Sequence, residues 1–291
     1  MDTPEAWITE SVARATGRAP ESWRRTVGGY TPASRWVVTF ADGSTAFVKA
    51  ATTPPTAQWL RWEHAFYSEV RAGFVARMVG WDASGPWPVL VLEDLSGAAW
   101  PPPWDAGRAA AVLDTLRTVA KTPPPGGLPS LAGRAPKMFL GWDEVATDPA
   151  PFLSLGLCSA GWFENALPAL LASQRMELFE GDELIHFDVR SDNLCFAGNR
   201  TILVDWNLAS IGNALSDVAS WLPSLEFEGG PAPEEVSPES SVFAGMVAGY
   251  FAANAAKPVI PDAPFVRRVQ REQLSTALPW AARALGLPPP A

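Results

Sequence analysis

One short stretch constrains the fold of this chain more than any other, because it places two acids and an amide beside three apolar runs. The runs predict three short strands, at residues 184–187, 194–196 and 201–204. Turn residues separate the last two runs and predict a hairpin. Asp188 and Asn193 then bracket the loop between the first two strands, and Asp205 follows the third. Since the hairpin returns the chain to this loop, we expect these three side chains to converge.

These three side chains suit phosphoryl transfer. Mg²⁺ prefers oxygen ligands and is usually held by one or two carboxylates together with the phosphates of a substrate. Asn193 and Asp205 would supply such oxygens. Asp188 would accept the proton of an attacking hydroxyl group, and Arg190 would face the transferred phosphate. An isolated acid and amide in a loop are more often turn formers, so the prediction depends on the surrounding elements.

The same residues resemble a known family. His186-x-Asp188-x4-Asn193, followed by Val204-Asp205-Trp206, is similar to the aminoglycoside phosphotransferase and choline kinase superfamily, whose members are relatives of protein kinases. The segment Val-Arg-Ser-Asp-Asn at 189–193 is particularly similar to a large bacterial group described as aminoglycoside phosphotransferase-like.

The resemblance implies an α+β fold of the bilobal protein-kinase-like kind. A small β-rich N-terminal lobe, residues 1–95, would bind the nucleotide, and a larger, mostly helical C-terminal lobe, residues 96–291, would carry the catalytic and acceptor-binding residues. ATP and Mg²⁺ are the implied cofactors, and a small molecule is the implied acceptor. Antibiotic resistance is among the roles that the resemblance suggests.

Two adjacent glycines form the first upstream element of the nucleotide site. Gly28 and Gly29 would let the backbone approach a ligand closely, and Ser34 adds a hydroxyl group that could help to cradle phosphates. The segment fits neither G-x-G-x-x-G nor the Walker pattern, so a plain hairpin turn would be the simpler interpretation of the glycines alone. The strands that follow favour the phosphate-binding interpretation.

A β-hairpin follows, with strands at residues 36–40 and 44–50 joined around Asp42-Gly43. Because side chains alternate along a strand, Phe47 and Lys49 share one face. Lys49 would reach the α- and β-phosphates of a nucleotide, as the corresponding lysine of kinases does. Phe47 would then lie under the adenine.

An apolar stripe predicts a helix at residues 58–70, formed by Trp59, Trp62, Phe66 and Val70. Glu63 lies on this helix, fourteen residues after Lys49, much as the ion-pair glutamate of a kinase small lobe does. Glu69 is the competing candidate. In a third interpretation, both glutamates are surface charges.

A buried-strand pattern at residues 89–92 ends in the turn Glu93-Asp94-Leu95. In kinase-like folds this junction is the hinge between the lobes, where backbone groups bind the edge of the adenine. The carbonyl of Glu93 and the N–H of Leu95 are the candidates for this contact.

Apolar periodicity predicts further helices, at residues 5–18, 106–120, 162–179, 242–256 and 266–285. Asp217 begins another apolar segment, where its position predicts an N-cap. The resemblance instead gives Asp217 the structural role of bracing the catalytic loop. The Pro-, Gly- and Glu-rich segment 226–239 predicts a surface loop.

The net charge and the cysteine content indicate which binding partners and which cell compartment we expect. The net charge of −9 argues against nucleic acid as a partner, since affinity there comes from Lys and Arg side chains. Cys158 and Cys195 form no disulfide framework or metal-binding spacing, which favours a reduced, cytoplasmic compartment. No segment approaches the apolar length of a membrane span.

Most of the excess negative charge lies in one region. Residues 201–256 contain seven acids and no Lys, Arg or His. An acidic rim attracts cations, so we expect a cationic acceptor such as an aminoglycoside-like compound. The candidate contacts are Glu226, Glu228, Glu234 and Glu235. A merely solvated acidic loop is the alternative.

The sequence favours a small-molecule kinase over two alternatives. A protein kinase needs an activation segment, yet only eleven residues separate Asp205 from Asp217 and no Ala-Pro-Glu follows. An inactive nucleotide-binding scaffold would lack a Lys, Asp or Asn of the motif, and none is missing, although Asn207 replaces a second acid often found in relatives. Choline, amino alcohols and sugars stay open as acceptors, and so does the oligomeric state.

Overall fold

The chain divides into two compact units, and the computed structural model describes residues 3–26, 32–134 and 140–290. The N-terminal unit comprises Met1–Pro101 and Asp192–Leu208. The C-terminal unit comprises Pro102–Ser191 and Ala209–Ala291. The polypeptide therefore crosses from one unit to the other three times.

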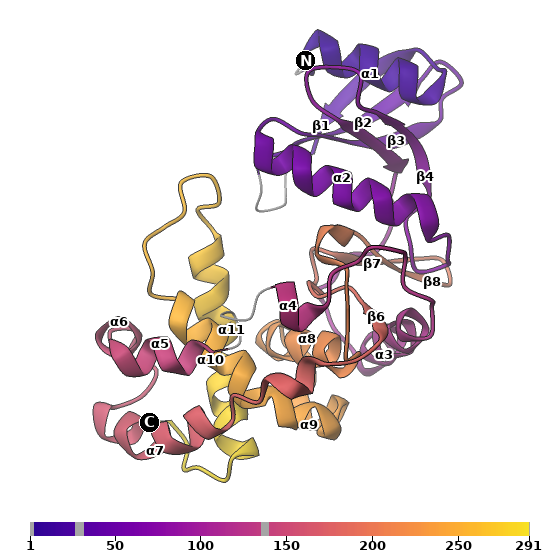
Figure 1. Ribbon diagram of the computed structural model, residues 1–291. Helices are drawn as coiled ribbons and strands as arrows, with labels where there is room; N and C mark the ends of the chain where they lie inside the picture. The colour runs from indigo at the N-terminus through magenta and orange to yellow at the C-terminus, as the bar shows by residue number, and fades with distance from the viewer. Residues whose placement is uncertain (1–2, 27–31, 135–139, 291) are drawn as a thin grey trace. The chain divides into compact units, whose positions relative to one another are not determined.

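The described N-terminal unit contains an antiparallel sheet of five strands (Figure 1). In the order β1-β2-β3-β5-β4, the strands are β1 (Pro20–Arg25), β2 (Ser34–Phe40), β3 (Thr45–Ala50), β5 (Val89–Glu93) and β4 (Met78–Asp82). The hairpin of β2 and β3 turns at Asp42-Gly43, as the sequence predicts. Gly43 has φ +77°, a left-handed conformation that glycine adopts without steric cost.

The two faces of this sheet have different environments because side chains alternate along each strand. One face packs against helix α1 (Ala6–Thr16) in an apolar core that includes Ile8, Trp36 and Val48. Lys49, the neighbour of Val48 in β3, therefore projects from the opposite face. The fold buries one face with apolar side chains and leaves polar groups on the other for a ligand.

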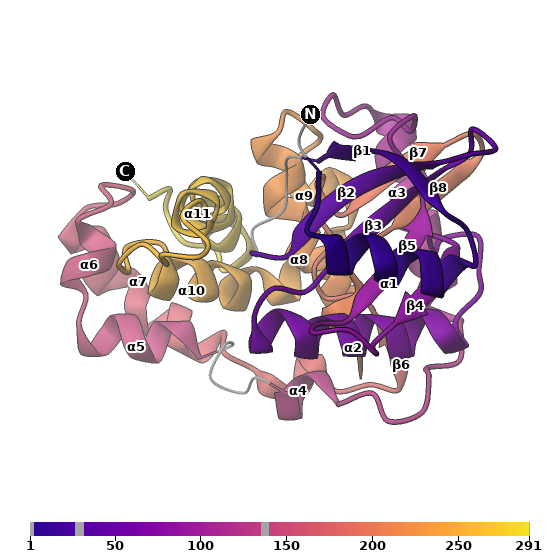
Figure 2. The same ribbon diagram turned by 90° about the horizontal axis from the view of Figure 1, so that it is seen from above.

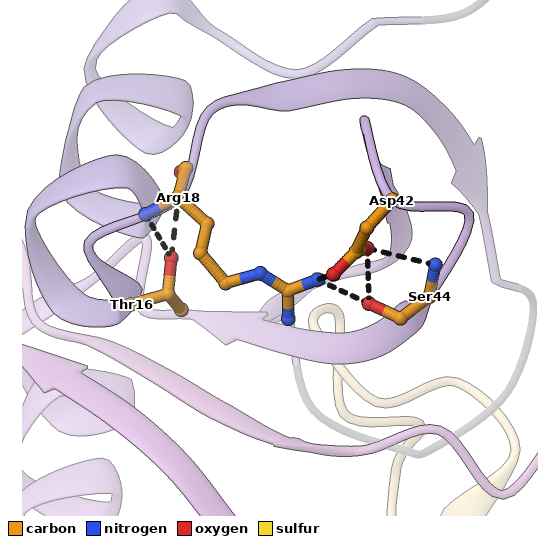
Figure 3. Close-up of polar contacts among 4 residues, drawn as sticks. All are labelled: Thr16, Arg18, Asp42 and Ser44. Atoms are coloured by element: carbon orange, nitrogen blue, oxygen red, sulfur yellow. Dashed lines mark hydrogen bonds and ion pairs between the residues drawn. The ribbon is translucent and has the colours of Figure 1, made fainter.

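A polar cluster ties the end of α1 to the β2–β3 turn (Figure 3). The Arg18 guanidinium forms an ion pair with Asp42, at 2.5 Å between Nη2 and Oδ1, and donates to the Ser44 hydroxyl. The Thr16 hydroxyl accepts a hydrogen bond from the Arg18 backbone N–H at 3.3 Å. Exposed ion pairs contribute little free energy, so the cluster mainly fixes the position of the turn.

Helix α2 (Pro54–Glu69) begins at a capping box on Thr53. Glu63 is buried on this helix, whereas Trp62 is 45% exposed. The expected apolar stripe is therefore wrong at Trp62, whereas Phe66 and Val70 are buried as expected. The physical reason is the ion pair with Lys49, which requires the helix to turn Glu63 inward.

A second hairpin lies in the N-terminal unit although its sequence comes much later. Its strands are β7 (Leu194–Ala197) and β8 (Arg200–Leu203). Isolated bridges join it to earlier segments, Val75 with Leu203 and Ala99 with Phe196. Trp206, in the short helix η3 (Trp206–Leu208), stacks on Phe66 of α2 with ring centroids 4.1 Å apart. The predicted lobes, residues 1–95 and 96–291, would assign this hairpin to the C-terminal lobe. In the structure it is grouped with the N-terminal unit.

Helices dominate the described part of the C-terminal unit (Figures 1 and 2). The α-helices are α3 (Ala106–Ala120), α4 (Leu131–Arg134), α5 (Gly141–Thr147), α6 (Ala150–Leu153), α7 (Ala160–Ala172), α8 (Leu215–Phe227), α9 (Pro233–Val236), α10 (Ala244–Asn254) and α11 (Val266–Ala284). The shorter elements are η2 (Met176–Phe179), β6 (Glu183–Ile185), β9 (Ser210–Gly212) and η4 (Pro238–Phe243).

Helix α10 packs against both α5 and α11, and α8 also packs against α11. The approach of α5 to α10 requires glycine, because a Cβ atom added at Gly141 would lie 2.0 Å from the carbonyl oxygen of Gly249. Among the residues that the structure describes, none of the helices combines the length and the apolar character needed to cross a membrane.

Two sequence predictions for this unit are wrong in detail. The single helix expected at residues 162–179 is interrupted, because α7 ends at Ala172 and the Ser173 hydroxyl donates back to the Leu170 carbonyl at 2.6 Å. The loop expected at residues 226–239 contains α9 and part of η4. Its Pro233 is buried, so this segment is packed rather than merely solvated.

Candidate active site

The polar face of the N-terminal sheet opens on a cavity of about 620 Å³. Its lining includes seven residues that the sequence analysis selected: Phe47, Lys49, Glu63, Glu93, Leu95, Asn193 and Asp205. All of them belong to the N-terminal unit. Ligand pockets for small molecules and cofactors have volumes of this order, about 300–1,000 Å³.

Lys49 holds two carboxylates in this cavity. Its Nζ lies 2.7 Å from Oε2 of Glu63 and 2.9 Å from Oδ1 of Asp205. Lys49 and Glu63 are both almost completely buried. Glu69, the competing candidate for the ion pair, lies on the exposed side of α2.

The pKa values of Glu63 and Lys49 are both raised, although burial and the charge of the ion-pair partner act in opposite directions on each. Burial raises the pKa of Glu63 from 4.5 to about 7, against the opposing effect of the Lys49 charge. For Lys49, burial lowers the pKa, but the carboxylates of Asp205 and Glu63 outweigh it, so its pKa lies above 10.5. Lys49 therefore stays protonated at neutral pH and provides a fixed positive charge in the cavity.

Asn193 and Asp205 lie on either side of the β7–β8 hairpin. The backbone carbonyl of Asn193 accepts a hydrogen bond from the N–H of Val204 at 2.9 Å, which brings the two ends of the hairpin together. Asp205 has φ +65°, an uncommon conformation for a residue other than glycine, and such strain is often found at functional sites.

The donor set of Asn193 and Asp205 fits Mg²⁺. Both side chains line the cavity and offer oxygen atoms, one from an amide and one from a carboxylate. Within residues 3–26, 32–134 and 140–290, no three His, Cys, Asp or Glu side chains gather as a ready metal site. A cation held here would complete its coordination with phosphate and water oxygens.

The candidate hinge is built around Glu93 and Leu95. The Glu93 carboxylate accepts from the backbone N–H of Arg77 at 2.9 Å and pairs with Arg200 at 3.0 Å. The Leu95 carbonyl accepts from the Trp100 indole at 3.2 Å. These contacts fix the segment after β5 beside the cavity, while its contact with adenine stays a prediction.

Positive side chains that no sequence motif marked also line the cavity, above all Arg35. Arg35 pairs directly with Lys49 in the β2–β3 register. The signal was present, because Arg35 and Lys49 lie equally far from Asp42 in the sequence, and a hairpin that turns around Asp42 places them opposite each other. Arg24, Arg25 and Trp100 also line the cavity and had no local motif that marked them.

Two other parts of the predicted nucleotide site lie elsewhere. Gly28 and Gly29 lie outside the described residues. Ser34 begins β2, where its hydroxyl accepts from the Trp36 indole at 2.7 Å, and it is not among the residues that line the cavity. Its contact with phosphate stays a prediction.

The C-terminal unit carries the candidate base, Asp188, on the loop after β6. Asp217 accepts hydrogen bonds from the backbone N–H groups of His186 and Phe187, at 2.7 and 2.6 Å. The N-cap predicted at Asp217 is therefore wrong, because this carboxylate lies within the first turn of α8 and bonds to the loop. Burial raises the pKa of Asp217, and the two amide hydrogen bonds oppose this shift. The bracing role that the resemblance implied is the one observed.

The loop is held in a strained conformation around Asp188. Phe187 has φ +62°, and the Nδ1 atom of His186 accepts the backbone N–H of Asp188 at 3.1 Å. Arg190 forms an ion pair with Asp188, at 3.2 Å between Nε and Oδ1. Arg190 therefore lies beside the candidate base, and its contact with a transferred phosphate stays a prediction.

The four candidate acceptor contacts differ in their surroundings within the C-terminal unit. Glu234 forms a two-pronged ion pair with Arg283, at 2.7 and 3.1 Å. Glu228 accepts hydrogen bonds from Ser191 and Trp104. Burial raises the pKa of Glu226, and Glu235 is exposed.

The sequence matches the model of one protein family. The model of the family described as "Phosphotransferase enzyme family" matches residues 22–251, most of the chain. The chain belongs to this family. The match confirms the resemblance to the aminoglycoside phosphotransferase and choline kinase superfamily that the motifs indicated. No curated protein matches the chain.

Solved structures of other phosphotransferases share the fold. A spectinomycin phosphotransferase in complex with ADP and spectinomycin has a TM-score of 0.60 at 10% identity, over 99% of this chain and 100% of that chain. An amicoumacin kinase in complex with AMP-PNP and Ca²⁺ has a TM-score of 0.56 at 10% identity, over 94% and 93%. A choline/ethanolamine kinase family protein from Mesorhizobium loti has a TM-score of 0.56 at 16% identity, over 91% and 92%.

These likenesses confirm the predicted fold class. This member of the phosphotransferase enzyme family has an α+β, bilobal protein-kinase-like fold, with a small β-rich N-terminal lobe and a larger, mostly helical C-terminal lobe.

Proposed function

We propose that this protein is an ATP-dependent kinase that transfers the γ-phosphate to a hydroxyl group of a small, cationic acceptor. The observation that carries the proposal is the buried contact of Lys49 with both Glu63 and Asp205 in a cavity of nucleotide-compatible volume. A buried lysine that two carboxylates keep charged is a binding group for phosphate oxygens.

ATP is the proposed donor. Phe47 and Leu95 offer an apolar surface and a hinge for the base, and Lys49 and Arg35 offer positive charge for the phosphates. The ADP and AMP-PNP bound to the spectinomycin and amicoumacin enzymes support a nucleotide in this role. Asn193 and Asp205 would hold Mg²⁺, which would neutralise negative charge on the phosphates.

Asp188 is the proposed base for the transfer. It accepts the proton of the acceptor hydroxyl while the hydroxyl oxygen forms a bond to the γ-phosphorus. The bond from this phosphorus to the bridging oxygen breaks, and its electron pair leaves with ADP. Arg190, which is paired with Asp188, limits the negative charge beside the reacting oxygen. Positioning and electrostatics supply most of the catalysis in such reactions.

The acceptor is proposed to be a small cation because the C-terminal unit is rich in acids. Glu226 and Glu235 carry this proposal, since Glu228 and Glu234 are already bonded inside the protein. The structural neighbours include a spectinomycin phosphotransferase, an amicoumacin kinase and a choline/ethanolamine kinase family protein, which supports an acceptor of this kind. An aminoglycoside-like compound is the acceptor we would test first.

A panel of acceptors tests the proposed function. Purified protein with MgATP is incubated with aminoglycosides, spectinomycin, choline, ethanolamine and neutral sugars, and products are detected by the mass of one added phosphate group. We expect phosphorylation of at least one cationic acceptor. Tight binding of ATP without any phosphorylated product would favour an inactive nucleotide-binding scaffold, and product from neutral sugars alone would remove the cationic acceptor.

A further inference from the structure

Helix α8 contacts the loop that carries Asp188 at two points. Near its N-terminal end, the Asp217 carboxylate accepts two backbone hydrogen bonds from the residues that precede Asp188. At its C-terminal end, the Glu228 carboxylate accepts a hydrogen bond from the Ser191 hydroxyl, at 2.6 Å between Oγ and Oε1. One contact lies before Asp188 in the sequence and the other lies after it.

The spacing of these two carboxylates matches the loop between them. Asp217 lies in the first turn of α8 and Glu228 is the C-cap of the same helix; a separation of eleven residues corresponds to about three helical turns and about 16 Å, which brings both to the same side. The four steps from Phe187 to Ser191 span at most about 14 Å when extended. The helix is therefore long enough to hold both ends of the loop.

The second oxygen of Glu228 has its own partner. The Trp104 indole donates to Oε2 at 2.7 Å, and the Trp104 ring packs on Trp221 of α8, with centroids 5.5 Å apart. Trp221 is fully buried and Trp104 nearly so. Glu228 is thus fixed to the core of the C-terminal unit through one oxygen and to the loop through the other.

We propose that Glu228 is a positioning residue for the proposed phosphoryl transfer, acting through Ser191 to fix the far end of the loop that carries Asp188. Asp217 alone holds only the near end. The residues directly after Ser191 are Asp192 and Asn193, so the same contact also fixes the point where the chain leaves the C-terminal unit. This inference rests on the proposed function, and it gives Glu228 a role other than contact with the acceptor.

Kinetics of four variants test the proposal, with the best acceptor of the panel. Ser191→Ala and Glu228→Ala should each lower kcat about tenfold, a loss of about 1.4 kcal/mol in transition-state stabilisation, and leave the KM for ATP within about twofold. The double variant should be no slower than Glu228→Ala alone, because Glu228→Ala already removes the contact that Ser191→Ala removes. Glu228→Gln should retain most of the activity, since its amide can accept from Trp104 and donate to Ser191. Glu239→Ala, a change at an exposed glutamate, is the matched control.

Hydrogen exchange gives a readout that does not depend on activity. Backbone amides of residues 188–192 should exchange faster in both Ser191→Ala and Glu228→Ala than in the wild type, while Glu239→Ala matches the wild type. If both variants exchange faster but the wild type phosphorylates no acceptor, the proposed function is rejected. The role of Glu228 in positioning the loop is then retained. Thermal unfolding identifies a variant that has lost its fold. If Glu228→Ala does not fold, Ser191→Ala, which removes only one hydroxyl group, is used to test the proposal.

Two outcomes would overturn the proposal. One is unchanged exchange of the loop in both variants. The other is a Glu228→Gln variant whose only change is a higher acceptor KM, with Ser191→Ala behaving as wild type, because that pattern identifies Glu228 as a contact with the acceptor.

Discussion

Lys49 and Glu63 form an ion pair of 2.7 Å in which both side chains are almost completely removed from water. Burying two charges is costly unless each satisfies the other, so this pair is a weak source of stability and a strong means of fixing geometry. Its value to the protein is that Lys49 is held charged and directed at the cavity, beside Asp205.

The pair predicts a pH dependence of stability. Because the pKa of Glu63 is raised from 4.5 to about 7, the folded protein retains a proton there that the unfolded chain has lost. The stability contributed by this carboxyl is fully present below pH 4.5 and is lost as the pH rises through 7. The difference in free energy of unfolding between wild type and Glu63→Gln should therefore change across this range. Urea unfolding of metal-free protein measures it, and Glu69→Gln should keep the wild-type dependence. Parallel curves for wild type and Glu63→Gln would contradict the shift.

Asp205→Ala should weaken binding of MgATP far more than binding of ATP without Mg²⁺, because it removes a proposed metal ligand. Lys49→Ala should weaken both, since it removes a phosphate contact. Calorimetric titrations with and without Mg²⁺ compare the two variants. Wild-type affinity and turnover of Asp205→Ala with MgATP would refute the metal assignment.

Asp188→Ala should lower phosphoryl transfer by about 10²–10⁴-fold, the usual contribution of a general base. Nucleotide affinity should stay within about threefold, because the base contacts the acceptor hydroxyl and not ATP. Product formation is followed by mass and ATP binding by calorimetry. Turnover at the wild-type rate would remove Asp188 from the mechanism.

Arg35→Gln should weaken ATP binding about tenfold, the scale of one lost hydrogen bond between charged groups. AMP lacks the outer phosphates, so its affinity should change by less than about twofold. Dissociation constants for both nucleotides are compared with those of Arg61→Gln, an exposed arginine on α2. Equal losses for ATP and AMP would show that Arg35 does not bind the outer phosphates.

Replacing Glu226 and Glu235 together with Gln should raise the acceptor KM, with a larger effect at low salt than at high salt. The KM for ATP should stay the same. Initial rates at two ionic strengths, with one cationic acceptor, measure both constants. If the acceptor KM at low salt stays unchanged, these two acids are a solubility feature.

The sequence could predict those parts of the site that local signals specify. The Asp42-Gly43 turn and the turn between β7 and β8 mark their hairpins directly, and the hairpins place Lys49, Asn193 and Asp205. Only tertiary packing could distinguish Glu63 from Glu69, because helical periodicity alone favoured a stripe through Trp62. Of that stripe, Phe66 and Val70 are buried, but Trp62 is turned outward because Lys49 requires Glu63 as a buried partner.

Contacts between distant segments could not be predicted. Glu228 meets Ser191 and Trp104 across 37 and 124 residues of sequence, and no local pattern links them. Its place in a Pro- and Glu-rich segment suggested a contact with a cationic acceptor, or a solvated acid, instead. Whether such a glutamate is exposed to solvent or bonded within the protein depends on side chains from distant parts of the sequence.

The β7–β8 hairpin, which is grouped with the N-terminal unit, limits how this protein can be recombined with its relatives. A chimera that exchanges only residues 1–101 would combine Lys49 and Glu63 from one parent with Asn193 and Asp205 from the other. It would also separate Phe66 from the Trp206 ring that stacks on it. A transplant of the proposed nucleotide site must therefore carry two pieces of chain, 1–101 and 192–208, and the first crossover point of the second piece falls directly after Ser191, at the end of the loop that carries Asp188.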